Sequence, residues 1–109
     1  MAIRILDNVT GAQTSDPVNI NPPNATALQN RGIAKTLEAF ATGTFTGNTL
    51  QIQTTHDSGL ATADWISGTA GGSGIKTVNT GKTGAAYARV VTTGTGGPYS
   101  VDLVVSPNY

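Results

Sequence analysis

Cysteine is absent from this chain of 109 residues, and histidine occurs only once. The lack of cysteine excludes disulfides and metal sites built on thiolates. One histidine and scattered aspartates match neither a zinc-binding spacing nor an EF-hand loop. An enzyme site needs several titratable side chains that the fold can bring together. We therefore expect no catalytic residue, no metal site and no cofactor, and we predict that the protein is not an enzyme.

Charge is scarce as well. Only 11% of the residues are charged, and six Lys plus Arg balance six Asp plus Glu. Nucleic-acid binding draws much of its affinity from a basic stripe that neutralises phosphates, so nucleic acid is not an expected partner. A net charge near zero also gives weak protection against association. Either threonine and asparagine solvate this surface adequately, or the protein works in a bound state.

Long apolar runs are missing too. The first residues, Met1 to Asp7, hold an apolar run that is too short for a signal-peptide core. No stretch of about 18 apolar residues occurs elsewhere. We expect no membrane partner and a protein made in the cytoplasm.

The residues that are abundant favour strands and turns. Glycine and threonine dominate, whereas the strong helix formers Leu, Glu and Lys are few. The clearest strand pattern is Tyr99 to Val105, in which apolar side chains alternate with smaller or polar ones. Ala86 to Thr93 is a second strand, and Gly94 to Pro98 supplies the glycines of a hairpin loop between the two. Further strand candidates are Ile3 to Leu6, Thr49 to Thr55, Ala63 to Ser67 and Ile75 to Asn79.

Two segments leave alternatives open. Gly11 to Gly32 is polar and rich in proline, and it forms either a short edge strand around Val18 to Ile20 or an extended arm. Arg31 to Thr42 has apolar residues at helical spacing, but it also alternates as a strand does. We favour the strand because the neighbouring segments are rich in strand patterns. Residues 1–109 then form one all-β domain, an antiparallel β-sandwich of jelly-roll or Ig-like type with seven to eight short strands.

The acidic and basic residues that stand close together do not predict a site. His56, Asp57 and Ser58 are adjacent in sequence, but neighbouring strand residues point to opposite faces, so no catalytic triad follows. Asp57 and Asp64 could pair as the carboxylates of a glycosidase, but aspartates beside a glycine-containing loop more often form turns. We interpret both groups as solvated turns.

Two glycine motifs are close to phosphate-binding loops but have the wrong spacing. Gly81-Lys82-Thr83 ends like a Walker loop, yet Lys76 stands where its first glycine should be. Gly71 to Gly74 is separated from a lysine by one residue and opens no helix. We interpret both as turns. The aromatic residues are too few for a stacking platform, and we expect Trp65 and Tyr87 to lie in the core.

Four segments follow one another along the chain: Thr10 to Val18, Gly43 to Gln53, Thr55 to Gly59 with the stretch on to Trp65, and Gly84 to Val91. Taken in this order, they resemble small β-sandwich virion proteins of tailed bacteriophages, the group of capsid decoration (cement) proteins and fibre-type modules. The resemblance covers most of the chain, and it assigns no residue roles, because these proteins share architecture and not a catalytic motif.

The resemblance implies a structural role in the virion. It implies a decoration protein that binds the major capsid lattice, often as a homotrimer, and stabilises the head. The partners would be the major capsid protein and further copies of this chain. The alternatives are a tail or head fibre domain that binds host-surface glycans, or a free carbohydrate-binding module.

Overall fold

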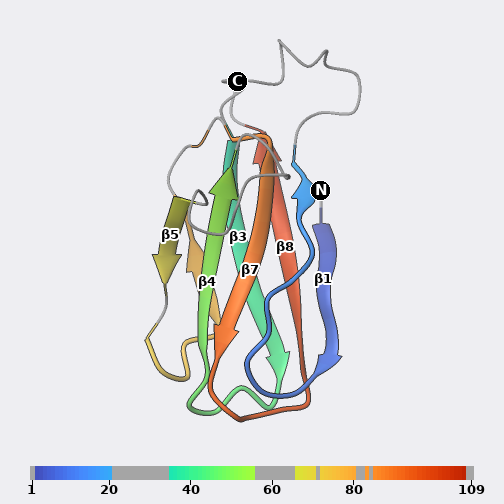
Figure 1. Ribbon diagram of the computed structural model, residues 1–109, viewed down its shortest axis with the longest axis vertical. Coiled ribbons are helices and arrows are strands. Elements are labelled where there is room, and N and C mark those ends of the chain that lie inside the picture. The colour runs from blue at the N-terminus through green and yellow to red at the C-terminus, as the bar shows by residue number, and fades with distance from the viewer. Residues whose placement is uncertain are drawn as a thin grey trace.

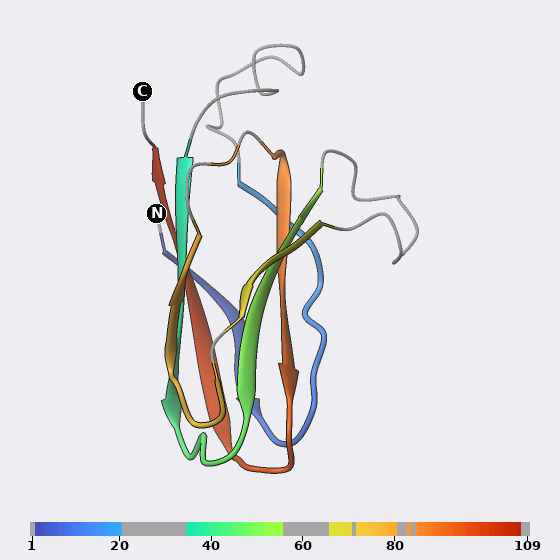
Figure 2. The same cartoon turned by 90° about the vertical axis from the view of Figure 1, so that its left-hand side faces the viewer.

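The computed structural model describes residues 2–20, 35–55, 66–70, 72–80, 83 and 85–107. Within these ranges eight strands form two four-stranded sheets that pack face to face as a β-sandwich (Figures 1 and 2). The strands are β1 (Ala2–Val9), β2 (Val18–Asn19), β3 (Lys35–Gly43), β4 (Thr49–Thr55), β5 (Ile66–Ala70), β6 (Thr77–Asn79), β7 (Tyr87–Thr93) and β8 (Tyr99–Pro107). The prediction of an all-β sandwich is confirmed.

The strand order identifies the type of sandwich. Sheet A has the order β1-β8-β3-β6 and sheet B has the order β2-β7-β4-β5, with every pairing antiparallel. Among the described strands, β4 and β5 are the only consecutive pair within one sheet; every other connection crosses to the opposite sheet. This is the order of an eight-stranded jelly roll, the first of the two predicted types.

The predicted hairpin between β7 and β8 is wrong. Strand β7 pairs with β2 and β4, whereas β8 pairs with β1 and β3. Residues 94–98 therefore carry the chain from sheet B to sheet A. The backbone of this loop packs against the β1–β2 connection, where the Gly11 amide donates a hydrogen bond to the Gly96 carbonyl at 3.0 Å.

The segment that could be read as helix or strand is a strand from Lys35 onward. Its side chains alternate between buried and half-buried along β3. A helix would have placed Leu37 and Phe40 on one face; in the sheet Leu37 is buried and Phe40 lies half-buried on the outer side. The polar segment before it supplies β2 at the edge of sheet B, and residues 21–34 lie outside the described part of the chain. Strand β5 overlaps the end of the predicted strand Ala63 to Ser67, and residues 63–65 lie outside the described part of the chain.

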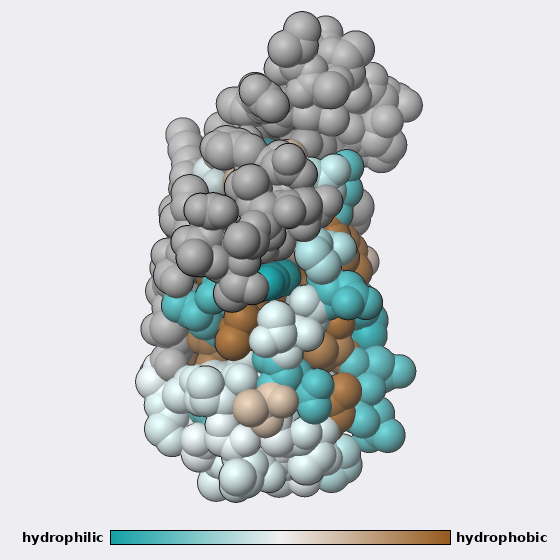
Figure 3. All heavy atoms as spheres, viewed as in Figure 1, coloured by the Kyte–Doolittle hydropathy of each residue, from teal (hydrophilic) through white to brown (hydrophobic). Residues whose placement is uncertain are grey.

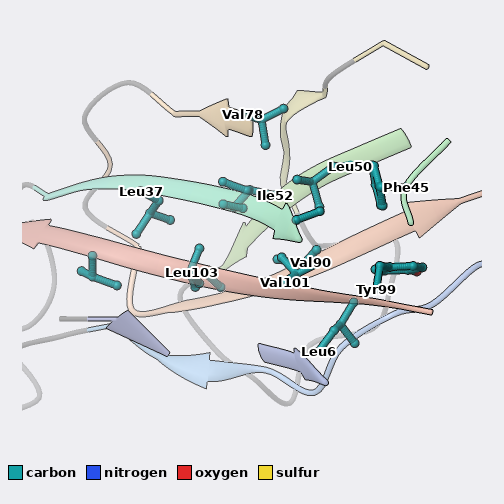
Figure 4. Close-up of a cluster of buried hydrophobic side chains, with 14 of the residues drawn as sticks. Leu6, Leu37, Phe45, Leu50, Ile52, Val78, Val90, Tyr99, Val101 and Leu103 are labelled. Carbon is teal, nitrogen blue, oxygen red and sulfur yellow. The ribbon is translucent and has the colours of Figure 1, made fainter. Parts of the chain in front are cut away.

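The core lies between the two sheets (Figure 4). It is built mainly from inward-facing residues that alternate along the long strands, which is the pattern expected of a sandwich; Ile20 and Phe45 come from the connections beside β2 and β3. The buried cluster consists of Leu6, Ile20, Leu37, Ala39, Ala41, Phe45, Leu50, Ile52, Val78, Ala88, Val90, Tyr99, Val101, Leu103 and Val105.

One end of the sandwich is closed by an aromatic pair. The rings of Phe45 and Tyr99 meet edge to face, with centroids 5.0 Å apart and an interplanar angle of 80°. The Tyr99 hydroxyl lies 2.5 Å from Thr92 Oγ1 and donates to the Gly11 carbonyl at 2.6 Å. This side chain thereby joins β8, β7 and the β1–β2 connection.

Removal of that hydroxyl is expected to be costly. Tyr99 is 1% exposed, so Tyr99→Phe leaves the Gly11 carbonyl and the Thr92 hydroxyl short of a buried partner. An unsatisfied buried polar group costs about 1–3 kcal/mol. Urea denaturation should show a loss of that size in the free energy of unfolding. Tyr87→Phe is the matched control, because Tyr87 is half-buried and outside the core; a loss of equal size there would contradict the assignment.

Candidate functional site

Most residues weighed as chemical candidates lie outside the described part of the chain. These are His56, Asp57, Ser58, Asp64, Trp65 and Lys82. Among the described residues, no group of three or more His, Cys, Asp or Glu could hold a metal ion. In the same residues no helix is long and apolar enough to cross a membrane.

The glycine-rich connection between β5 and β6 is a turn, as predicted, where the structure describes it. The Gly74 amide donates to the Asn48 carbonyl at 2.9 Å, and the Ile75 amide donates to the Gly72 carbonyl at 3.1 Å. A phosphate-binding loop aims its free amides at the ligand. Here both amides are used to bind protein carbonyls.

The outward side of sheet B carries an ordered set of polar side chains. We call this the sheet-B face and define it by Thr49, Gln51, Gln53, Tyr87, Arg89, Val91 and Thr93. The residues between them, such as Leu50, Ile52 and Val90, are buried in the core, so alternation places this set on the outside. In Figure 3, seen from this side, hydrophilic and intermediate residues cover most of the described surface, and brown appears in separated patches.

Three of these side chains form a hydrogen-bonded row. Arg89 Nε donates to Gln53 Oε1 at 2.7 Å, and Gln53 Nε2 donates to Gln51 Oε1 at 3.3 Å. Arg89 and Gln53 are directly opposite each other on β7 and β4. Because β4 also pairs with β7 through Gln51 and Val91, the row runs along the middle of sheet B.

The ends of the face differ in character. Toward the aromatic-closed end of the sandwich, the hydroxyls of Thr49 and Thr93 hydrogen-bond across the strands. At the other end lies Tyr87, opposite Thr55. Tyr87 was predicted to be a core residue. It is half-buried and belongs to the outward set of β7, because its buried neighbours Ala86 and Ala88 determine which side of the strand packs inward.

The outer side of sheet A is more charged. Arg4 Nε donates to Asp102 Oδ1 at 2.5 Å, and this bond with its ionic attraction raises the pKa of Arg4. Asp102 stands opposite Phe40 on β3, and Val104 stands opposite Glu38. This side therefore holds two half-buried apolar side chains beside carboxylates, unlike the amide row of sheet B. Lys35, in contrast, faces inward at 2% exposure, and burial lowers its pKa.

No family model matches the sequence, and no curated protein matches it. Among solved structures, the chain is similar to the SPBc2 prophage-derived protein YomS. The two share 13% identity with a TM-score of 0.64, over 97% of this chain and 92% of YomS. It is also similar to the PBSX exported protein XepA, at 12% identity and a TM-score of 0.60, and all of this chain corresponds to 38% of XepA.

A third similar structure is chitosan-binding module 1 of a chitosanase/glucanase from Paenibacillus sp. IK-5. It shares 19% identity with a TM-score of 0.52, over 96% of this chain and 75% of the module. At these identities the likeness shows a shared fold. The sandwich of this chain is thus a fold that a prophage-derived protein and a carbohydrate-binding module both adopt.

Proposed function

We propose that this chain is a non-catalytic structural protein of a phage particle, and specifically a decoration protein that binds the major capsid lattice and strengthens the head. The observation that carries the proposal is the jelly-roll strand order, in a fold that matches a prophage-derived protein over nearly the full length of both chains. Jelly rolls recur in viral capsid and lectin domains. This support comes from the fold, and experiment must identify the face that docks on the capsid.

The surface supports a protein that works in a bound state. The chain is neutral and only 11% charged, so it relies little on charge repulsion to stay dispersed. Seven of the eight described strands pair with segments distant in the sequence, so the two sheets link the beginning, middle and end of the described part of the chain. In the proposed role the partners are the major capsid protein and other copies of this chain, assembled as a homotrimer in the virion.

Binding to capsids tests the proposal directly. Purified protein added to empty capsids of the encoding phage that lack it should sediment with them and saturate at a fixed ratio to lattice sites. The decorated capsids should disassemble at a higher temperature. Sedimentation velocity of the free protein measures whether it is a trimer. A protein that stays in the supernatant at every capsid concentration would overturn the capsid role.

A second candidate function is favoured by one observation. The amide row on the sheet-B face is suited to a hydroxyl-rich ligand, as in a fibre domain or a carbohydrate-binding module that binds glycans. The two functions are separable by experiment, because capsid binding involves no glycan.

A further inference from the structure

The hydrogen-bonded row on the sheet-B face has a fixed direction. A guanidinium group can only donate, so the Gln53 atom that faces Arg89 Nε must be the carbonyl oxygen. The amide nitrogen of Gln53 then faces Gln51, and because that nitrogen also only donates, the atom it meets must be Gln51 Oε1. Arg89 therefore determines which atom is oxygen and which is nitrogen in the side-chain amides of both Gln53 and Gln51.

The consequence is a pair of donors at the end of the row. The N–H groups of Gln51 Nε2 donate to no protein group in the part of the chain that the structure describes, and the side chain is half-buried. The hydroxyl groups of Thr49 and Thr93 provide a further donor on the same face. When one of Thr49 and Thr93 donates to the other, the second keeps its own O–H for an outside acceptor. Val91, directly opposite Gln51, places a half-buried apolar side chain beside these donors.

The composition of this face selects among classes of partner. It carries one charged side chain, Arg89, and its Nε is already used within the row. A nucleic acid would require several cations along its phosphates. The centre of a protein interface is usually rich in aromatic and apolar side chains, whereas the middle of this face holds two amides, one guanidinium group and one apolar side chain, Val91. Neutral donors beside a small apolar spot fit a sugar, which presents oxygen acceptors at its edge and C–H groups on its ring.

We propose that the sheet-B face binds a neutral glycan that carries acetamido groups, with an acetamido carbonyl oxygen accepting from Gln51 Nε2. A carbonyl oxygen only accepts and has two lone pairs, so it matches a donor-only site better than a hydroxyl group, which also donates. The acetamido methyl group would lie against Val91. This proposal deepens the second candidate function and does not depend on capsid binding.

The same geometry disfavours a deacetylated, cationic glycan. Its ammonium groups only donate, and they would face the Gln51 N–H groups, which also only donate. We therefore expect this chain to bind an N-acetylated glycan more tightly than chitosan, the deacetylated polymer after which the similar binding module is named. The ligand proposed for this chain therefore differs from the ligand in that module's name.

Calorimetric titration of the whole chain with three tetrasaccharides tests the proposal. Tetra-N-acetylchitotetraose should bind, and cellotetraose, which lacks the acetamido groups, should bind about fivefold more weakly. Chitotetraose should bind more weakly still. Equal or tighter binding of cellotetraose or chitotetraose would overturn the acetamido assignment. Absence of binding to all three would overturn the glycan site and leave the capsid proposal untouched.

One variant isolates the donors. Gln51→Glu keeps an oxygen acceptor for Gln53 Nε2 but replaces both outward N–H donors with a carboxylate oxygen, so affinity for tetra-N-acetylchitotetraose should fall at least about tenfold. Glu38→Gln is the matched control, because it changes one carboxylate on the outer side of sheet A and should leave affinity unchanged. Equal losses in both variants would contradict the proposed face.

A measurement on the unaltered protein guards against a variant that fails to fold. In a ¹⁵N-labelled sample, the sugar should shift the side-chain amide signals of Gln51 and Gln53 and the Nε–H signal of Arg89. Shifts confined to residues of the outer side of sheet A, or to the loops, would place the ligand elsewhere and overturn the assignment of this face.

Discussion

Leu103→Ala is expected to lower the free energy of unfolding by about 3–5 kcal/mol. Leu103 is fully buried at the centre of sheet A, where it stands between Ile3 on β1 and Ala39 on β3. Its removal leaves a cavity that the paired strands cannot close. A domain of this size is stable by only about 5–15 kcal/mol, so the variant should melt at least about 10 °C lower in calorimetry.

The neighbouring residue supplies the control. Val104 follows Leu103 on β8 but lies half-buried on the outer side of sheet A, opposite Ala2 and Glu38. Val104→Ala should cost less than about 1 kcal/mol, because it removes few core contacts. If the two substitutions cost the same, the inward and outward sides of β8 are assigned wrongly.

Gly43→Ala is expected to lower the free energy of unfolding by about 3 kcal/mol, by a different mechanism. Gly43 has a φ of +95°, and a Cβ atom there would lie 2.7 Å from the Pro98 carbonyl oxygen and 3.1 Å from the Tyr99 Cα. The positive φ alone costs a residue with a side chain about 1–2 kcal/mol. The clash is with backbone, which cannot move without separating β3 from β8 at their last pair, Gly43 and Tyr99.

Gly47→Ala separates these two costs. Gly47 lies in the β3–β4 connection, four residues after Gly43, and has a φ of +75°, but a Cβ atom there would meet nothing within 4 Å. Both substitutions restrict the unfolded chain equally, so that contribution cancels. Chemical denaturation should show a loss of about 1–2 kcal/mol for Gly47→Ala. A loss as large as that of Gly43→Ala would show that the close approach to Pro98 has no energetic effect.

The strands could be predicted from the sequence because their signal is local. Strand β8 alternates apolar and smaller residues over its whole length, and Thr49 to Thr55 was predicted with its observed bounds. Strand partners are not a local property. Five residues that include three glycines can close a hairpin or cross between sheets, and only the pairing of β8 with β1 and β3 shows that residues 94–98 cross.

The sheet-B face could be predicted from the sequence only in part. Gln51 and Gln53 were recognisable as the polar side of a half-buried strand, but their orientation depends on Arg89, which is 36 positions away from Gln53. Only the β4–β7 register places these side chains together. Tyr87 was misplaced for a related reason. Its alanine neighbours indicated burial, but alternation along β7 buries the alanines and leaves the tyrosine on the outer side.

The place of β8 between β1 and β3 has a consequence for synthesis. The residues of β8 are synthesised after those of the other seven strands. Ala2 on β1 therefore cannot pair with Val104 until nearly the whole sequence has been made. At typical elongation rates the interval between Ala2 and Val104 is about 5–20 seconds, during which β1 lacks its partner β8. Folding of this domain should therefore be a single late event, completed over about milliseconds to seconds once β8 emerges.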